Sequence, residues 1–149
     1  MKSRKRSKLI LLAEDDNTQR YLFSRAVNHL PLDVKLVTVD DGQELMDYLH
    51  DEYNEKPDLI FLDVNMPFKS GLECLQEIRQ LELCQDTPVV IYTTSQEAAD
   101  RQVAAEYRAD LYLVKDGDMR SLMRILLLLL TNQSHALEKE NKLFNQSYF

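Results

Sequence analysis

Five short apolar runs, each followed by a longer segment with helical spacing, restrict the fold of this 149-residue chain more than any other feature of its sequence. The runs are rich in Leu, Ile and Val, and they span residues 9–13, 34–39, 59–62, 89–92 and 111–114. Most are continuous rather than alternating, as expected for strands buried on both faces of a parallel sheet. With right-handed connections, this order predicts an α/β fold: a doubly wound (βα)5 parallel sheet, flavodoxin-like, with strand order 2-1-3-4-5.

Between these runs, apolar residues recur every three or four positions, which is the spacing of the buried side of a helix. The residues that define the first four predicted helices are Phe23, Val27 and Leu30; Leu45, Met46, Leu49 and Tyr53; Leu72, Leu75, Ile78 and Leu81; and Ala99, Val103 and Tyr107. A fifth helix begins near Asp118. The fourth helix has a thin apolar stripe among many polar neighbours, so we expect the sheet to hold it weakly.

The apolar content of 44% and the charged content of 29% are typical of one soluble globular domain, which we place at residues 8–131. Residues 1–7 form a basic leader whose charges we expect to be solvated, although such an arm could also touch nucleic acid or a membrane. The apolar run after the leader is too short for a secretory signal, and the run at 125–130 is too short for a membrane span. The net charge of -7 argues against nucleic-acid binding. We therefore expect a cytoplasmic protein without nucleic-acid or membrane contacts.

The last predicted helix and the polar tail at 132–149 bear on assembly. Residues 125–130 are apolar on every side of the helix, and a helix that lies on one face of a sheet cannot bury all of them. We therefore expect a homodimer through the fourth helix, the fifth strand and the fifth helix. Apolar residues recur at intervals of seven into the tail, at Met123, Leu130, Leu137 and Phe144. This recurrence would extend the helix, but Ser134 and Asn141 at the second apolar position of each heptad favour a frayed tail.

Polar residues follow four of the predicted strands directly. They are Glu14 and Asp15 after the first, Asp63 and Asn65 after the third, Thr93 and Ser95 after the fourth, and Lys115 after the fifth. In a doubly wound sheet the ligand site lies outside the carboxyl ends of the strands, so these side chains should meet in one crevice. Three carboxylates packed together repel one another unless a cation is present, and hard oxygen ligands favour Mg2+. The sequence therefore predicts a magnesium site.

The chemistry of this crevice suits phosphoryl transfer to a carboxylate. Asp63 follows four apolar residues, and a carboxylate at a buried strand end costs several kcal/mol unless it is paired or metal-bound. Lys115 can hold a carboxylate or phosphoryl oxygen, and Thr93 offers a hydroxyl donor. A nucleophile, a metal clamp and two partners for oxygen are the parts that this reaction needs. Taken singly, Thr93 and Lys115 could equally be a strand end and a solvated lysine.

Over roughly residues 8–131 the chain resembles the receiver domain of two-component response regulators. Four motifs carry the resemblance: Leu-Leu-Ala-Glu14-Asp15-Asp; Phe-Leu-Asp63-Val-Asn65-Met-Pro67 with Gly71 four residues on; Tyr-Thr93-Thr-Ser; and Tyr112-Leu-Val-Lys115. Jointly these motifs are specific, whereas any one alone would be weak. The strand order predicted above is also that of a chemotaxis member of the family.

The resemblance implies a role for each of these residues. Asp63 would be the phosphoacceptor, Asp15 a direct metal ligand, Glu14 a ligand through water, and Asn65 a ligand through its backbone carbonyl. Thr93 and Lys115 would bind the phosphoryl oxygens, and Thr93 with Tyr112 would form the switch pair. Asn65 and Ser95 would modulate the lifetime of the phosphoryl group.

The implied function is that of a single-domain response regulator. A sensor histidine kinase would phosphorylate Asp63 with the help of Mg2+, and a downstream protein would bind a surface that depends on phosphorylation. The added negative charge would draw Thr93 inward and open space for Tyr112 to follow. We expect slow autodephosphorylation and no turnover as an enzyme.

The sequence departs from the family at one position. The residue after Lys115 is usually proline, but here Asp116 and then Gly117 follow, which puts the usual cis peptide bond and the path of the loop in doubt. This departure, the Thr93-Thr-Ser triplet and the lack of an output domain resemble the small regulators that partner bacteriophytochromes.

Two other functions fit part of the site. An aspartyl-nucleophile phosphatase would also use Asp, Thr, Lys and Mg2+, but it needs a carboxyl group as general acid two residues after the nucleophile, where this chain has Asn65. A scaffold with an inactive site would leave the intact acidic set without a role.

Overall fold

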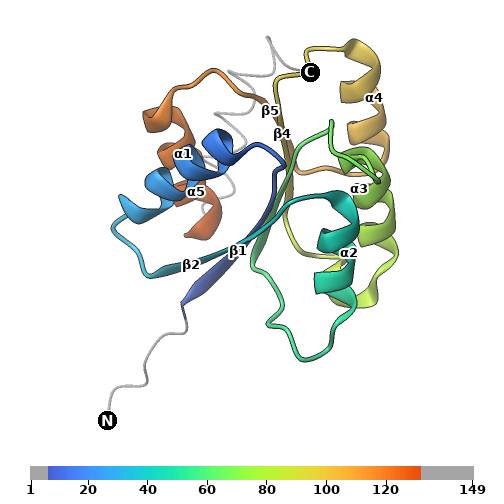
Figure 1. The fold of residues 1–149 in the computed structure, drawn as a ribbon, viewed down its shortest axis with the longest axis horizontal. Helices are drawn as coiled ribbons and strands as arrows, with labels where there is room; N and C mark the ends of the chain where they lie inside the picture. The colour runs from blue at the N-terminus through green and yellow to red at the C-terminus, as the bar shows by residue number, and fades with distance from the viewer. Residues whose placement is uncertain (1–6, 132–149) are drawn as a thin grey trace.

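The computed structural model describes residues 7–131 and shows a parallel sheet of five strands between two layers of helices (Figure 1). The strands are β1 (Lys8–Ala13), β2 (Val34–Val39), β3 (Leu59–Leu62), β4 (Val89–Thr93) and β5 (Leu111–Val114). Their order is β2-β1-β3-β4-β5, and every neighbouring pair is parallel. The predicted fold class and strand order are therefore confirmed. The predictions for the leader at 1–6 and the tail at 132–149 lie outside the described residues.

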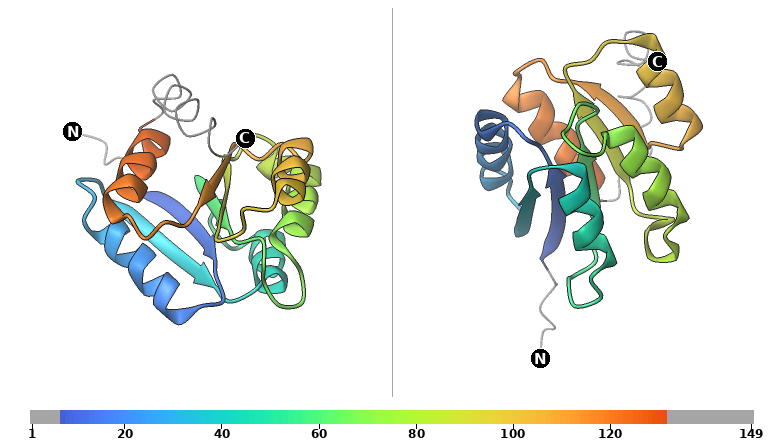
Figure 2. Two further views of the ribbon diagram at one scale, coloured as in Figure 1. Left: turned by 90° about the horizontal axis from the view of Figure 1, so that it is seen from above. Right: turned by 45° about the vertical axis from the view of Figure 1, so that its right-hand side comes forward.

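The helices divide between the two faces of the sheet (Figures 1 and 2). They are α1 (Asn17–Asn28), α2 (Gly42–His50), α3 (Gly71–Gln80), α4 (Ala98–Glu106) and α5 (Met119–Leu130), with a short 3-10 helix at Glu82–Cys84. Helices α1 and α5 lie side by side on one face, and α2, α3 and α4 cover the other. Two buried apolar clusters result, one under each layer of helices.

Side-chain caps fix the start of four of these helices. Asp16, Asp41, Ser70 and Asp118 each accept a hydrogen bond from a backbone amide in the first turn of the helix that follows. Such a cap satisfies an amide that has no partner within the helix. Helix α4 has no side-chain cap of this kind, and Ala104 is its one buried residue. The expectation that the sheet holds α4 weakly agrees with both observations.

Two residues that were predicted on the buried side of a helix are exposed. Ala99 was expected to face the sheet but is exposed, and Ala104 takes that place. Alanines stand on several sides of α4, so the spacing alone could not fix the buried side. Tyr53 was expected on the apolar stripe of the second helix, but α2 ends at His50 and the Tyr53 side chain is 91% exposed.

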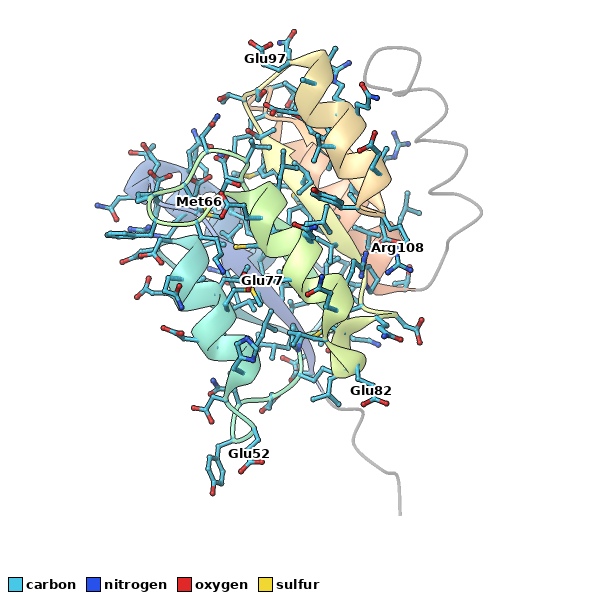
Figure 3. All side chains as sticks on the ribbon, turned by 90° about the vertical axis from the view of Figure 1, so that its right-hand side faces the viewer. Glu52, Met66, Glu77, Glu82, Glu97 and Arg108 are labelled. Atoms are coloured by element: carbon cyan, nitrogen blue, oxygen red, sulfur yellow. The ribbon has the colours of Figure 1, made fainter. Side chains whose placement is uncertain are left out.

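Arg79 forms a buried connection that the sequence did not suggest. Its guanidinium donates hydrogen bonds to the carbonyls of Thr87 (2.8 Å) and Arg108 (2.8 Å), and it pairs with Asp110 at 2.9 Å. Arg108 lies in the turn after α4, on the side of the molecule drawn in Figure 3. Because the fork of Arg79 satisfies several carbonyls at once, it ties the end of α3 to the segments that lead into β4 and β5.

Two expectations for residues 7–131 concern a membrane-spanning helix and a cis peptide bond after Lys115. No helix in this range is long and apolar enough to cross a bilayer. The range also holds no cis peptide bond, so the bond after Lys115 is trans.

The backbone of Gly71 lies against the strand end that carries Asp63, so a side chain at position 71 should destabilise the fold. A Cβ at Gly71 would stand 2.0 Å from the carbonyl oxygen of Asp63. We expect Gly71→Ala to lower the free energy of unfolding by about 3 kcal/mol or more, because backbone must move to relieve the overlap. Urea unfolding monitored by circular dichroism measures this loss.

Gly117→Ala is the matched control. A Cβ there meets open space, although the backbone φ of 78° disfavours any side chain. We expect a loss of about 1 kcal/mol for this variant. Equal losses at the two positions would contradict the close approach of Gly71 to Asp63.

Candidate functional site

Three carboxylates meet at the carboxyl edge of the sheet. Oxygen atoms of Glu14, Asp15 and Asp63 all lie within 4.8 Å of one another. Glu14 and Asp63 are buried, at 3% and 8% exposure, whereas Asp15 is open to solvent. The predicted meeting of these residues is confirmed.

The acidic triplet after β1 divides its side chains among three environments. Glu14 turns inward, Asp15 faces solvent, and Asp16 caps α1 by accepting from the amide of Gln19 at 2.9 Å. The amide of Asp16 in turn donates to the Glu14 carboxylate at 3.2 Å. Arg20 donates to the carbonyl of Glu14, so the first turn of α1 fixes the end of β1.

Lys115 joins the carboxylates across the sheet. Its Nζ donates to Oδ2 of Asp63 at 2.7 Å and forms an ion pair with Oε1 of Glu14, and its side chain is 6% exposed. Burial works against the charge of the ammonium, but the hydrogen bonds to Asp63 and Glu14 outweigh it and raise the pKa of Lys115. Lys115 therefore stays protonated at neutral pH and holds the ends of β1, β3 and β5 together.

For Glu14, burial outweighs the favourable contacts of the charged form, whereas for Lys115 the contacts outweigh burial. Burial raises the pKa of Glu14 above its ordinary value, although the Lys115 ammonium works to lower it, and the charge of Asp63 adds to the rise. Three carboxylates and one ammonium leave an excess of negative charge in a partly dry pocket. A hard cation with oxygen ligands relieves such an excess, so this donor set fits Mg2+.

The loop after β3 folds back on the strand end. The amide of Asn65 donates to Oδ1 of Asp63 at 3.2 Å, and the amide of Gly71 donates to the carbonyl of Val64 at 3.0 Å. The Asn65 side chain is exposed. Asp63 is thus fixed by Lys115 on one carboxylate oxygen and by backbone on the other.

The end of β4 is linked to β5 and α4 by hydrogen bonds. Thr93 is fully buried, and its Oγ1 accepts from the amide of Ser95 at 3.2 Å. The Ser95 hydroxyl donates to Asp100 of α4 at 2.6 Å, and the Tyr112 hydroxyl donates to the Ser95 carbonyl at 2.9 Å. Tyr112 is fully buried, and Arg101 lies over its ring at 5.7 Å. The inward space that phosphorylation was expected to open is therefore already filled by Tyr112.

Residues that the sequence did not single out complete the site. Tyr92 lies with its ring centroid 5.6 Å from Nζ of Lys115, while Asp100 and Arg101 bring α4 to Ser95 and Tyr112. Tyr92 lies in an apolar run that predicts a buried strand, and this pattern does not mark it as a site residue. Asp100 and Arg101 stood among the polar residues of the weakest helical stripe, so no local signal separated them from solvated surface.

Known proteins are similar to this chain in sequence and in fold. The family model described as response regulator receiver domain matches residues 10–127. Response regulator Rcp1 of Synechocystis sp. is 32% identical over 123 residues, which cover 80% of this chain and 84% of Rcp1.

Solved structures of response regulators are also similar to this chain in fold and sequence. The Mn(2+)-bound form of Rcp1 has 34% identity and a TM-score of 0.72, covering 79% of this chain and 88% of that one. The phosphorylated cyanobacterial phytochrome response regulator RcpA has 34% identity and a TM-score of 0.74, with coverage of 80% and 89%. The bacteriophytochrome response regulator RtBRR has 31% identity and a TM-score of 0.71, with coverage of 83% and 78%. With its sheet order, its acidic edge and the match over residues 10–127, this chain belongs to the family of response regulator receiver domains.

Proposed function

We propose that this chain is a single-domain response regulator, residues 8–131, that accepts a phosphoryl group on Asp63 from a sensor histidine kinase. The observation that carries the proposal is the position of the Asp63 carboxylate, 2.7 Å from Nζ of Lys115 and within 4.8 Å of the oxygens of Glu14 and Asp15. A buried carboxylate with a fixed ammonium beside it and an adjacent acidic pair is suited to act as a nucleophile toward phosphorus.

The proposed reaction transfers a phosphoryl group from a histidine of the kinase. An oxygen of Asp63 forms the new bond to phosphorus, and the bond from phosphorus to the imidazole nitrogen breaks. The nitrogen keeps that electron pair and takes up a proton. Lys115 then moves its hydrogen bond from the carboxylate to a phosphoryl oxygen, and the Thr93 hydroxyl donates to another.

The acidic set supports Mg2+ as the cofactor. Asp15 and Asp63 would bind it directly, Glu14 through water, and Asn65 through its backbone carbonyl. Bound Mg2+ supplies charge neutralisation between an anionic nucleophile and an anionic phosphoryl group. Asn65 lies two residues after Asp63 and Ser95 two residues after Thr93, and we assign both the control of slow autodephosphorylation.

The switch is proposed to run from Thr93 to α4. When the Thr93 hydroxyl turns to the phosphoryl group, it gives up the hydrogen bond from Ser95. Ser95 also holds Tyr112 through its carbonyl and α4 through Asp100, so the change reaches both. Because the sheet buries little of α4, this helix can shift at small energetic expense.

The relatives support a particular class of partner. RcpA is a cyanobacterial phytochrome response regulator, and RtBRR is a bacteriophytochrome response regulator. We infer that the kinase of this chain is also a bacteriophytochrome, that both are cytoplasmic, and that the signal passes to a downstream protein. We further infer a homodimer through α4, β5 and α5, where Leu127, Leu128 and Leu129 are only half-buried within the described chain.

The charge balance of the pocket predicts the effect of Glu14→Gln. Because the pKa of Glu14 is raised in the folded state, ionising it opposes folding at pH 7. We expect the metal-free variant to be more stable than the wild type at pH 7, because the penalty for ionising Glu14 is then absent. The gain should shrink as pH falls through the raised pKa of Glu14 toward its ordinary value of 4.5, because both side chains are then neutral.

Thermal unfolding with and without Mg2+ measures this effect. Added Mg2+ should stabilise the wild type more than the variant, because the variant has lost an anionic oxygen. Glu52→Gln, at an exposed position, is the control and should change the stability by less than about 0.5 kcal/mol in either condition. An equal response of all three proteins to Mg2+ would place the metal elsewhere.

Phosphorylation itself is tested with acetyl phosphate and Mg2+, followed by intact mass. We expect one labile phosphoryl adduct on the wild type, none on Asp63→Asn, and none when EDTA replaces Mg2+. No adduct under any metal condition would support the scaffold with an inactive site. Rapid release of phosphate without an adduct would support the phosphatase.

Thr93→Ala tests the switch. We expect this variant to gain the phosphoryl group but to lose the difference in self-association between the phosphorylated and unphosphorylated protein, because the link from phosphoryl to Ser95 is gone. Sedimentation velocity measures the association. Thr94→Ala, an exposed neighbour, should behave as the wild type. A difference that survives in Thr93→Ala would remove Thr93 from the switch.

A further inference from the structure

Lys115 needs more restraint than its two ion pairs provide. A lysine ammonium has three donor protons on a flexible four-carbon stem. Two of the directions around Nζ are taken by Asp63 and Glu14. Both carboxylates belong to the proposed metal set, so these contacts must weaken when a metal or a phosphoryl group arrives. A third contact that does not belong to the metal set would keep the ammonium in place throughout.

Tyr92 supplies such a contact. Its ring centroid lies 5.6 Å from Nζ of Lys115, within the range in which a cation is attracted to the face of an aromatic ring. Burial raises the pKa of Tyr92 to about 12, so the side chain stays neutral and does not compete as an anion. The backbone reinforces the pairing, because the amide of Lys115 donates to the carbonyl of Thr93, the residue after Tyr92, at 2.7 Å.

Two other rings hold the ring of Tyr92. Phe61 of β3 meets it edge-on at 5.8 Å and 78°, and Phe23 of α1 lies at 6.2 Å and 60°. Phe23 and Phe61 also contact each other at 5.0 Å. A ring that packs against two neighbours of fixed position cannot turn away from Lys115 without disturbing the core.

We propose that Tyr92 is a positioning residue for phosphorylation, which holds the Lys115 ammonium at Asp63 through the face of its ring. This inference rests on the proposed function, because it names the residue that keeps a proposed phosphoryl ligand in place. Tyr92 does not touch the reacting atoms. Tyr92 affects phosphorylation by holding Lys115, and the contact is made by its aromatic ring rather than by its hydroxyl.

Three variants separate this role from ordinary core packing. Tyr92→Phe keeps the ring, Tyr92→Leu removes it, and Leu122→Ala removes buried volume from the same apolar cluster without removing a ring. The full chain is incubated with acetyl phosphate and saturating Mg2+, and the rate of adduct formation is read by intact mass. NMR of the metal-free protein records the Lys115 methylene and ammonium protons, which a nearby ring face shifts upfield.

We expect Tyr92→Leu to be phosphorylated about threefold to tenfold more slowly than the wild type, the rate change that matches a cation–π contact of ordinary strength. Tyr92→Phe and Leu122→Ala should both react within about twofold of the wild type. The upfield shift of Lys115 should persist in Tyr92→Phe and vanish in Tyr92→Leu. This pattern would establish that the ring acts through Lys115.

Several results would overturn the inference. They are ordinary Lys115 shifts in the wild type, a Tyr92→Leu rate equal to that of the wild type, or a Leu122→Ala rate as slow as that of Tyr92→Leu. If Tyr92→Leu fails to fold, Tyr92→Met replaces it, and the wild-type spectrum alone still decides whether the ring faces Lys115. A wild type without any adduct would remove the proposed function, whereas the NMR result would remain valid as a test of the contact.

Discussion

The structure depends on the bridge that Lys115 makes between Glu14 and Asp63. Each of the three residues follows a different strand, and the parallel order β1-β3-β4-β5 brings those ends to one edge. Without the ammonium, two buried carboxylates would face each other in a pocket that burial has partly dried. The same bridge leaves the pocket short of positive charge, because Asp15 adds a third carboxylate. Lys115 thus offsets part of the repulsion in the metal-free fold, and the negative charge that remains favours the arrival of a cation.

The elements around this edge differ in how firmly they are held, and the difference suits a switch. The acidic residues stand on buried strand ends that helix caps and the close approach of Gly71 keep in place. Helix α4 has one buried residue and no side-chain cap. Its contacts with the site run through Ser95, which bonds to Thr93, Asp100 and Tyr112, and through Arg101, which lies over the Tyr112 ring. Free energy gained when Asp63 is phosphorylated at the firmly held strand ends would therefore be expressed as a movement of the weakly held helix α4.

The apolar runs predicted the strands almost to the residue, because strands buried on both faces, as β1, β3, β4 and β5 are here, leave short continuous apolar runs. Asp63 and Lys115 could be assigned to one crevice because parallel strands end at a common edge. The buried side of α4 could not be predicted, since its alanines carry no directional signal. The network of Arg79 was also missed, because most of its partners are backbone carbonyls, which leave no trace in the sequence.

The position of the Tyr112 ring depends on hydrogen bonds at the site as well as on packing. The sequence suggested that this ring moves inward when a phosphoryl group opens space, yet it is already buried and bonded to Ser95 without one. Without a phosphoryl group, Lys115 already donates a hydrogen bond to Asp63. Thr93 already accepts a hydrogen bond from the amide of Ser95, whose carbonyl accepts one from Tyr112. In this chain the inward position of Tyr112 is therefore compatible with an unphosphorylated site. Phosphorylation would then act by changing what Thr93 and Ser95 bond to, and α4 would respond to a new hydrogen-bond pattern rather than to the entry of a ring.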